Sequence, residues 1–316
     1  MLSRTADNLF WLARYLERAD HLARLIVATR RLAALPKAYG GAQSEWESVL
    51  DSAGADLPEA GADEPVDEAK AVGILVFAQN NPSSIRNCID HARTNARAVR
   101  TALTAEMWDA VNSGYLELKA LEATPDRGDG ERLAKVIDLA RRISLAYDGG
   151  ADRTMLRNDA FYFSRLGQFI ERADNTARLL DVKYHVLLPD KEVVGGSLDY
   201  FQWAAILRAV SANTAYHWVY RQSLRPWLVA DLLVLKREMP RSLISCYENI
   251  VGDLDRLGRS HGRQGPAQRH ARATFGRLDL LTMDSLFQGG LHEFLESFLA
   301  DNNRLGALIA EQYLFG

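Results

Sequence analysis

The chain is poor in the residues that most often mark turns and disulfide bridges. It has 9 prolines and 2 cysteines in 316 residues. Residues 126–188 and 267–316 contain no proline, whereas a β-sandwich of this length would need many closely spaced turns. Cys88 and Cys246 stand far apart without a C-x-x-C pair, so they fit free thiols in a reducing cytosol and not a disulfide scaffold.

Long hydrophobic runs and an excess of one charge are missing too. The longest apolar candidate, residues 228–235, contains Asp231 and falls well short of the roughly 20 residues of a membrane span. The first residues lack the apolar core of a signal peptide. A net charge of −3 provides no field that would attract nucleic acid or anionic lipid. We therefore expect a cytoplasmic protein that binds neither nucleic acid nor membranes.

The sequence does contain helical periodicity. In residues 5–35 and 152–187, apolar side chains recur at the three- and four-residue spacing of a long helix. The best strand-like run, residues 72–77, has no hairpin partner. The sequence therefore predicts an all-α fold, a multi-helix bundle. Further helices are expected over residues 66–79, 81–112, 131–147, 199–221 and 284–313, and from Pro226 and Pro240 onward.

Two segments depart from this pattern. Residues 38–69 hold nine acidic residues and no basic one, which predicts an acidic, mobile insertion over residues 38–65 with one short helix near Trp46. Residues 256–277 hold six arginines and no acidic residue, and their glycines predict a solvated loop over residues 258–268. The alternative interpretations are an acidic docking surface for the first segment and phosphate contacts for the second.

One sequence segment occurs twice. Residues 12–26 read LARYLERADHLARLI and residues 166–180 read LGQFIERADNTARLL, with eight of fifteen positions identical at an offset of 154. Duplication of a helical unit is the simplest explanation. We expect one domain, residues 1–316, that is built of two related halves of about 1–150 and 151–316 and packed as one body.

Helical projection singles out the charged residues of this repeat. At about 100° per residue, the Asp of each Glu-Arg-Ala-Asp motif falls inside the apolar stripe, and the Glu and the later Arg fall beside it. The Arg of the motif itself falls on the opposite side. A half-buried carboxylate needs a partner, so we expect the later arginines to pair with the acids. The residues concerned are Glu17, Asp20, Arg24, Glu171, Asp174 and Arg178.

Three interpretations of this cluster stay open at the sequence level. It is a buried network that sets the register of two helices, a polar cavity that holds a charged ligand, or a carboxylate site for metal ions. Glu17-x-x-Asp20-His21 is similar to the Glu-x-x-His motif of carboxylate bundles, but neither copy has that motif and Asn175 replaces His21 in the second copy. We therefore expect no bound metal.

Several long blocks of the chain resemble the alpha-E family, which is named for its helical content and its recurrent Glu-Arg motif. The opening block reads MLSRTADNLFWLARYLERAD, and TMLRNDAFYFSRLGQFIERADNTARLLDVKYH forms the third. The resemblance covers nearly the whole chain and is weakest in the acidic insertion and in residues 258–272. The remaining blocks are NPSSIRNCIDHARTNARAVR followed by AEMWDAVN (105–112), and VADLLVLKREMPRSL (229–243).

The resemblance implies an all-helical fold and a set of partners. Genes of this family usually lie beside, or are fused to, a circularly permuted ATP-grasp ligase, often with a transglutaminase-like protease. That association implies ATP-dependent amide-bond formation on amino acids or peptides, with ATP bound by the ligase and no cofactor bound directly by this chain. The family's Glu-Arg residues fall on Glu17, Arg18, Glu171 and Arg172, and the second block adds the secondary candidates Arg93, Asn95, Arg97, Glu106, Trp108 and Asn112.

No independent catalytic signature accompanies these residues. Gly149-Gly150 lacks the lysine and the spacing of a phosphate-binding loop, and no order of Ser, His and Asp or of Cys and His recurs near a motif. The leading hypothesis is a helical partner of an amide-forming ligase with the charged cluster as its ligand site. The alternatives are a non-catalytic helical scaffold and, less favoured, a carboxylate-bridged metalloenzyme.

Overall fold

The fold is all-α, as predicted. The computed structural model describes residues 3–34, 45–55, 66–124, 130–186 and 197–314. Within these residues it contains 14 α-helices, short π- and 3-10-helical turns and no strand. None of the described helices is both long enough and apolar enough to cross a bilayer.

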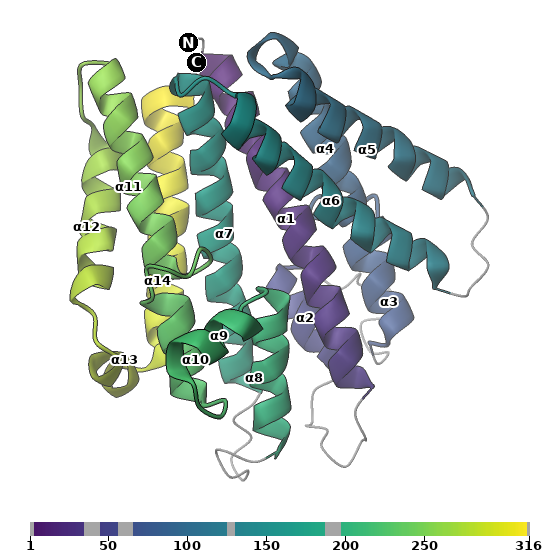
Figure 1. Ribbon diagram of the computed structural model, residues 1–316, viewed down its shortest axis with the longest axis vertical. Helices are drawn as coiled ribbons and strands as arrows, with labels where there is room; N and C mark the ends of the chain where they lie inside the picture. Colours follow the sequence, from purple (N-terminus) through teal and green to yellow (C-terminus); the bar gives the residue numbers. More distant parts are fainter. Residues whose placement is uncertain (1–2, 35–44, 56–65, 125–129, 187–196, 315–316) are drawn as a thin grey trace.

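Two long helices form the centre of the molecule (Figure 1). They are α1 (Ser3–Ala33) and α7 (Asp159–Val186), and they pack against each other along much of their length. Their contacts keep a nearly constant sequence offset, from Phe10–Gly167 to Glu17–Arg172, so the two helices run in the same direction. Because other helices pack around this pair, both helices bury several faces and are core elements, not surface helices.

The other helices surround this central pair (Figure 1). On one side α1 packs against α4 (Ile85–Ala98) and α6 (Glu131–Thr154), and α5 (Ala105–Ala123) covers both. On the other side α7 packs against helices from the C-terminal part of the chain. These helices and their outer neighbours are α11 (Leu243–Ser260), α12 (Pro266–Leu280), α13 (Met283–Gly289) and α14 (Leu291–Ile309).

Two shorter helices bridge the central pair. Both α2 (Glu45–Ala53) and α8 (Ser197–Ala209) contact α1 and α7. Helices α9 (Asn213–Tyr220) and α10 (Pro226–Val234) follow α8. Because α2 buries Trp46, Val49 and Leu50, the predicted short helix near Trp46 is confirmed, and this part of the expected mobile insertion belongs to the fold. Residues 38–44 and 56–65 of that insertion lie outside the described residues.

Several predicted helix boundaries differ from the structure for local reasons. Helices α4 and α11 each start three residues after the proline expected to open them, because Ser84 and Ser242 cap their first turns. The helix expected over residues 81–112 is broken before Thr104, which caps α5. The helix expected to end at Gly149-Gly150 continues to Thr154.

Two further connections also differ. The helix expected over residues 199–221 breaks at Ser211, which has a left-handed backbone with φ 57°. Helix α11 extends to Ser260 and α12 begins at Pro266, so the loop predicted over residues 258–268 is reduced to residues 261–265.

Candidate functional site

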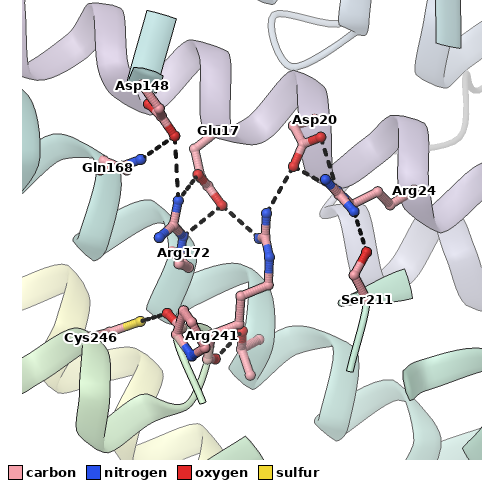
Figure 2. A network of polar contacts seen from close by, with 11 residues as sticks. Glu17, Asp20, Arg24, Asp148, Gln168, Arg172, Ser211, Arg241 and Cys246 are labelled. Atoms are coloured by element: carbon pink, nitrogen blue, oxygen red, sulfur yellow. Dashed lines mark hydrogen bonds and ion pairs between the residues drawn. The ribbon is translucent and has the colours of Figure 1, made fainter. Parts of the chain in front are cut away.

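Glu17 lies at the contact between α1 and α7, where it is buried and paired with two arginines (Figure 2). Arg172 of α7 donates from Nε and Nη2 to the Glu17 carboxylate at 3.1 and 2.7 Å. Arg241 donates from Nη1 to Glu17 Oε1 at 2.7 Å. Both carboxylate oxygens therefore accept charge-assisted hydrogen bonds from a guanidinium group.

Asp20, one turn further along α1, continues the network. Arg24 donates from Nε to both Asp20 oxygens at 2.9 and 2.7 Å, which confirms the expected pairing of these two residues. Arg241 donates from Nη2 to Asp20 Oδ2 at 2.9 Å, so its guanidinium spans the two carboxylates (Figure 2). We call Glu17, Asp20, Arg24, Arg172 and Arg241 the Glu17 cluster.

Arg241 is held in place by the turn that precedes α11. Thr176 of α7 donates its hydroxyl to the carbonyl of Arg241 at 2.9 Å. The next residue, Ser242, caps α11 and donates its hydroxyl to the carbonyl of Lys236 at 2.6 Å. The backbone of this turn is thus fixed on both sides of Arg241, which orients its side chain toward α1.

A second cluster surrounds Glu171 on the other side of the helix pair. Arg18 donates from Nε and Nη2 to Glu171 at 2.6 and 3.1 Å, and Arg14 donates from Nε at 2.8 Å. Asp174 accepts from Arg178 Nε at 2.7 Å, again as expected. We call Arg14, Arg18, Glu171, Asp174 and Arg178 the Glu171 cluster. The two Glu-Arg pairs of the repeated motif thus interact crosswise, each Glu with the Arg of the other helix.

These arginines fix the charge of both glutamates. Burial opposes ionisation of Glu17, but Arg172 and Arg241 outweigh it and lower the pKa to about 2. Burial likewise opposes ionisation of Glu171, and Arg18 and Arg14 lower its pKa to about 2. Both side chains are therefore carboxylates at neutral pH, which suits charge pairing and does not suit general-base catalysis.

Two other titratable groups border the clusters. Burial, opposed by Arg172 and reinforced by the negative charge of Glu17, raises the pKa of Asp148 to about 7. Asp148 accepts a hydrogen bond from the Gln168 amide (Figure 2). Burial and the positive charge of Arg241 lower the pKa of His21 to about 4, so His21 is neutral at physiological pH.

A cavity of about 170 Å³ adjoins the Glu171 cluster. It lies between α1, α2, α7 and the turn before α4, and Arg18, Glu171 and Arg178 are among its lining residues. Four of its lining side chains carry a buried polar atom without a hydrogen-bond partner in the structure. These atoms are His21 Nε2, Ser52 Oγ, Asp174 Oδ1 and Asn175 Nδ2. Because unpaired buried polar groups are costly, such a concentration indicates a site for polar molecules.

The eight primary residues predicted from the sequence are all brought together at the α1–α7 contact, in two clusters and not in one. Glu171 borders the cavity and Glu17 does not. Arg18 lies apart from Glu17 and Asp20, on the other side of α1 as the projection predicts, and there it pairs with Glu171 of α7.

The six secondary candidates lie on α4 and α5, and no hydrogen bond or ion pair of the described residues joins them to either cluster. Arg93 stacks on the ring of Tyr115, with 4.8 Å from the guanidinium carbon to the ring centroid. The guanidinium of Arg100 stacks on the ring of Trp108 in the same way, with 5.0 Å from the guanidinium carbon to the ring centroid. The residues concerned are Arg93, Asn95, Arg97, Glu106, Trp108 and Asn112.

Sequence reasoning missed Arg14, Arg241 and the cavity residue Ser52. Arg241 is about 220 positions from its carboxylate partners, so helical spacing cannot find it. A signal does exist: Pro240-Arg241-Ser242 is similar to Pro82-Ser83-Ser84, and a cysteine follows each at the same distance.

Among the described residues, no group of three or more His, Cys, Asp and Glu side chains is arranged to hold a metal ion. Glu17 and Asp20, the carboxylates of the metal-site alternative, are engaged by arginines instead. Cys88 and Cys246 are free and buried, and burial raises the pKa of each thiol to about 12, which makes them poor nucleophiles.

The architecture defines an all-helical protein with a charged contact between two central parallel helices. A family described as a predicted alpha-helical domain with a conserved ER motif, Alpha-E, matches residues 1–314. The chain therefore belongs to the Alpha-E family.

Curated relatives share this region within longer chains. An uncharacterized protein of Mycobacterium bovis is 24% identical over 291 residues, and uncharacterized proteins of two Mycobacterium tuberculosis strains show the same identity. The match covers 83% of this chain and 31% of each relative, so the chain spans about a third of their length. No solved structure matches the chain.

Proposed function

We propose that this chain is the helical partner of an ATP-grasp ligase that forms amide bonds on amino acids or peptides. In this proposal the ligase binds ATP, and the Glu171 cluster with its cavity supplies a ligand site. A transglutaminase-like protein belongs to the same system. The proposal follows from the family resemblance and agrees with the mycobacterial relatives, where the matching region is part of a chain about three times as long.

The observation that carries a ligand-binding role is the group of unpartnered polar atoms at the cavity. A network that only fixed helix register would have its polar atoms satisfied, as those of Glu17 and Asp20 are. Asp174 Oδ1 and its three polar neighbours are buried and have no hydrogen-bond partner among the described residues. The pKa of about 2 of each glutamate supports a role in binding and not as a base.

The test is reconstitution with the neighbouring or fused ligase. The two proteins are expected to co-purify, and amide formation with ATP hydrolysis is expected only when both are present. Full ligase activity without this chain would show that the proposal is wrong.

A non-catalytic scaffold is the second candidate, and the complete pairing of Glu17 favours it. The two can be separated with Asp174→Asn, which alters the cavity while leaving an amide to contact Arg178. The ligand-site proposal expects lower ligase activity per folded molecule, whereas the scaffold expects no change. Asp138→Asn is the matched control, because Asp138 forms an exposed pair with Arg142 at the same four-residue spacing.

A further inference from the structure

The turns that flank the two clusters are similar in sequence and in hydrogen bonding. Pro240-Arg241-Ser242 precedes α11 and Pro82-Ser83-Ser84 precedes α4. In each turn the last serine caps the helix, and a cysteine one turn later points its sulfur at a carbonyl of the turn. Ser83 therefore occupies the place in the Glu171 cluster that Arg241 occupies in the Glu17 cluster.

This exchange leaves the Glu171 cluster without a spanning guanidinium. Glu17 Oε1 accepts from both Arg172 and Arg241, whereas Glu171 Oε1 accepts from Arg18 alone. Arg241 also reaches Asp20, but the equivalent Asp174 has Oδ1 buried without a donor. The cavity thus lacks a cationic donor between two carboxylates.

Arg14 explains how Glu171 is neutralised while the cavity stays open. Arg14 supplies the second guanidinium to Glu171 but is not among the residues that line the cavity. Its counterpart 154 positions later in the repeat is Gln168, which bonds Asp148 instead of a glutamate. The second arginine of the Glu171 cluster, Arg14, therefore lies beside the cavity. The second arginine of the Glu17 cluster, Arg241, instead lies between the two carboxylates.

A second exchange removes an acceptor. Gly54 after α2 and Ser211 after α8 both have left-handed backbones, with φ 59° and 57°, and close the same turn onto the preceding helix. Arg24 donates from Nη1 to the Ser211 hydroxyl. Gly54 offers no side chain to the equivalent Arg178, whose Nη1 would lie 3.8 Å from a Cβ at that position.

We propose that this cavity binds a small α-amino acid as a zwitterion. Its ammonium group takes the place of the Arg241 guanidinium and donates to Asp174 Oδ1 and Glu171 Oε1. Its carboxylate accepts from Arg178 and from Asn175 Nδ2, in the place left by the serine hydroxyl. The inference rests on the proposed function in taking the Glu171 cluster as the ligand site, and it names the substrate class.

Charge and size select this class of ligand. The Glu171 cluster has three arginines against two carboxylates, so a simple cation would add to a positive excess. A simple anion has no proton to donate to the unpartnered Asp174 Oδ1, whereas the ammonium group of a zwitterion does. The volume of about 170 Å³ is close to that of a cavity of about 150 Å³ known to hold benzene. Glycine, alanine and serine fit these limits.

Isothermal titration calorimetry of the full chain tests the proposal directly. Glycine, L-alanine and L-serine are the probes, and methylammonium, acetate and inorganic phosphate are the comparison ions. At least one amino acid is expected to bind in the millimolar range or tighter, and each comparison ion at least about tenfold more weakly. Binding of none of the amino acids, or equal binding of a single ion, would overturn the proposal.

Two variants place the ligand in this cavity. Arg14→Gln with Ser83→Arg gives the Glu171 cluster the composition of the Glu17 cluster, so the introduced guanidinium is expected to fill the cavity and abolish binding. Asp138→Asn, at an exposed ion pair outside both clusters, is the control and is expected to retain binding. Ser52→Ala is the second variant, because it removes a cavity-lining hydroxyl that has no partner among the described residues and because its counterpart in α8 is the buried Ala209. It is expected to fold normally and to bind at least about tenfold more weakly. Unchanged affinity in Ser52→Ala and in the double variant would place the ligand elsewhere.

This experiment fails or succeeds separately from the reconstitution. The titration uses this chain alone, without ligase or ATP. Dependence of the ligase on this chain with no amino-acid binding would reject only the cavity assignment. Amino-acid binding with a ligase that needs no partner would reject only the proposed function.

Discussion

Glu17 is buried beside two arginines that come from distant parts of the chain. Glu17→Gln keeps the shape of the side chain but leaves Arg172 and Arg241 without their charged partner. Breaking such a buried pair costs about 3–5 kcal/mol in the free energy of unfolding. Chemical denaturation measures this loss.

The matched control is Glu117→Gln. Glu117 pairs with Arg142 at 2.7 Å, but both side chains are about half exposed. Removal of an exposed pair costs about 1 kcal/mol or less. Equal losses in the two variants would show that the Glu17 pair contributes no more than a surface ion pair.

His21 gives the fold a defined dependence on pH. Burial and Arg241 lower its pKa to about 4 from an unfolded value of 6.5, while Glu17 and Glu171 oppose this shift. The unfolded chain therefore takes up a proton first as the pH falls. The stability that neutral His21 allows is present above about pH 6.5 and is lost progressively toward pH 4, by at most about 3 kcal/mol.

His21→Leu removes this titration. The difference in unfolding free energy between wild type and variant is expected to fall by up to about 3 kcal/mol between pH 7 and pH 4. Asp148, whose raised pKa gives the opposite trend in the same range, is common to both proteins and cancels in the difference. Urea denaturation at half-unit pH steps measures it, and a difference that stays constant with pH would contradict the assignment.

At the scale of the helix, Gly167 sets how closely α1 and α7 approach. A Cβ at Gly167 would lie 2.1 Å from the carbonyl oxygen of Phe10, which is backbone and cannot move aside. Gly167→Ala is therefore expected to destabilise the protein by about 1–3 kcal/mol or more, although alanine favours helices.

Gly149 provides the matched control in α6. A Cβ there meets nothing within 4 Å, so Gly149→Ala is expected to stabilise the protein by up to about 1 kcal/mol. Thermal unfolding of both variants measures the two changes. The same sign of effect in both would show that the α1–α7 approach is not limiting.

The helices were predictable to the extent that their signals are local. The periodicity of residues 5–35 located both ends of α1 to within two residues, and that of residues 152–187 located the end of α7 to within one. The predicted start of α7 is seven residues too early, because residues 152–154 form the last turn of α6 and α7 begins at Asp159. For α4 and α11, the proline predicts a helix start that is too early, because the serine two positions after it caps the first turn. Both errors follow from competing signals within three residues.

The candidate site was predictable only within each helix. The spacing of four residues correctly paired Arg24 with Asp20 and Arg178 with Asp174. The partners of the glutamates come from another helix or from a distant turn, which a single-stripe projection cannot represent. The cavity depends on the small side chain of Ser83 and on the absence of a side chain at Gly54, and such a space becomes visible only when the neighbouring residues are placed in three dimensions.

At the scale of the whole molecule, the two halves of the chain share one core. Helix α1 belongs to the first half but packs against α7 and α8 of the second, and α2 packs against α7. The glutamate of each half depends on arginines of the other, since Glu17 is paired by Arg172 and Arg241 and Glu171 by Arg14 and Arg18. Separation would leave each half with an exposed apolar helix face and a carboxylate without partners.

We therefore expect that residues 1–156 and 157–316, divided between α6 and α7, do not fold as separate proteins. Each fragment alone is expected to show a broad, non-cooperative thermal transition by circular dichroism, and an equimolar mixture is expected to regain a cooperative one. Glu17→Gln in the first fragment should weaken this association, because the ion pair it loses crosses the interface. A cooperative transition of either fragment alone, near the midpoint of the intact chain, would instead make the halves independent domains, and the charged contact between α1 and α7 would then be an interface between domains and not part of one core.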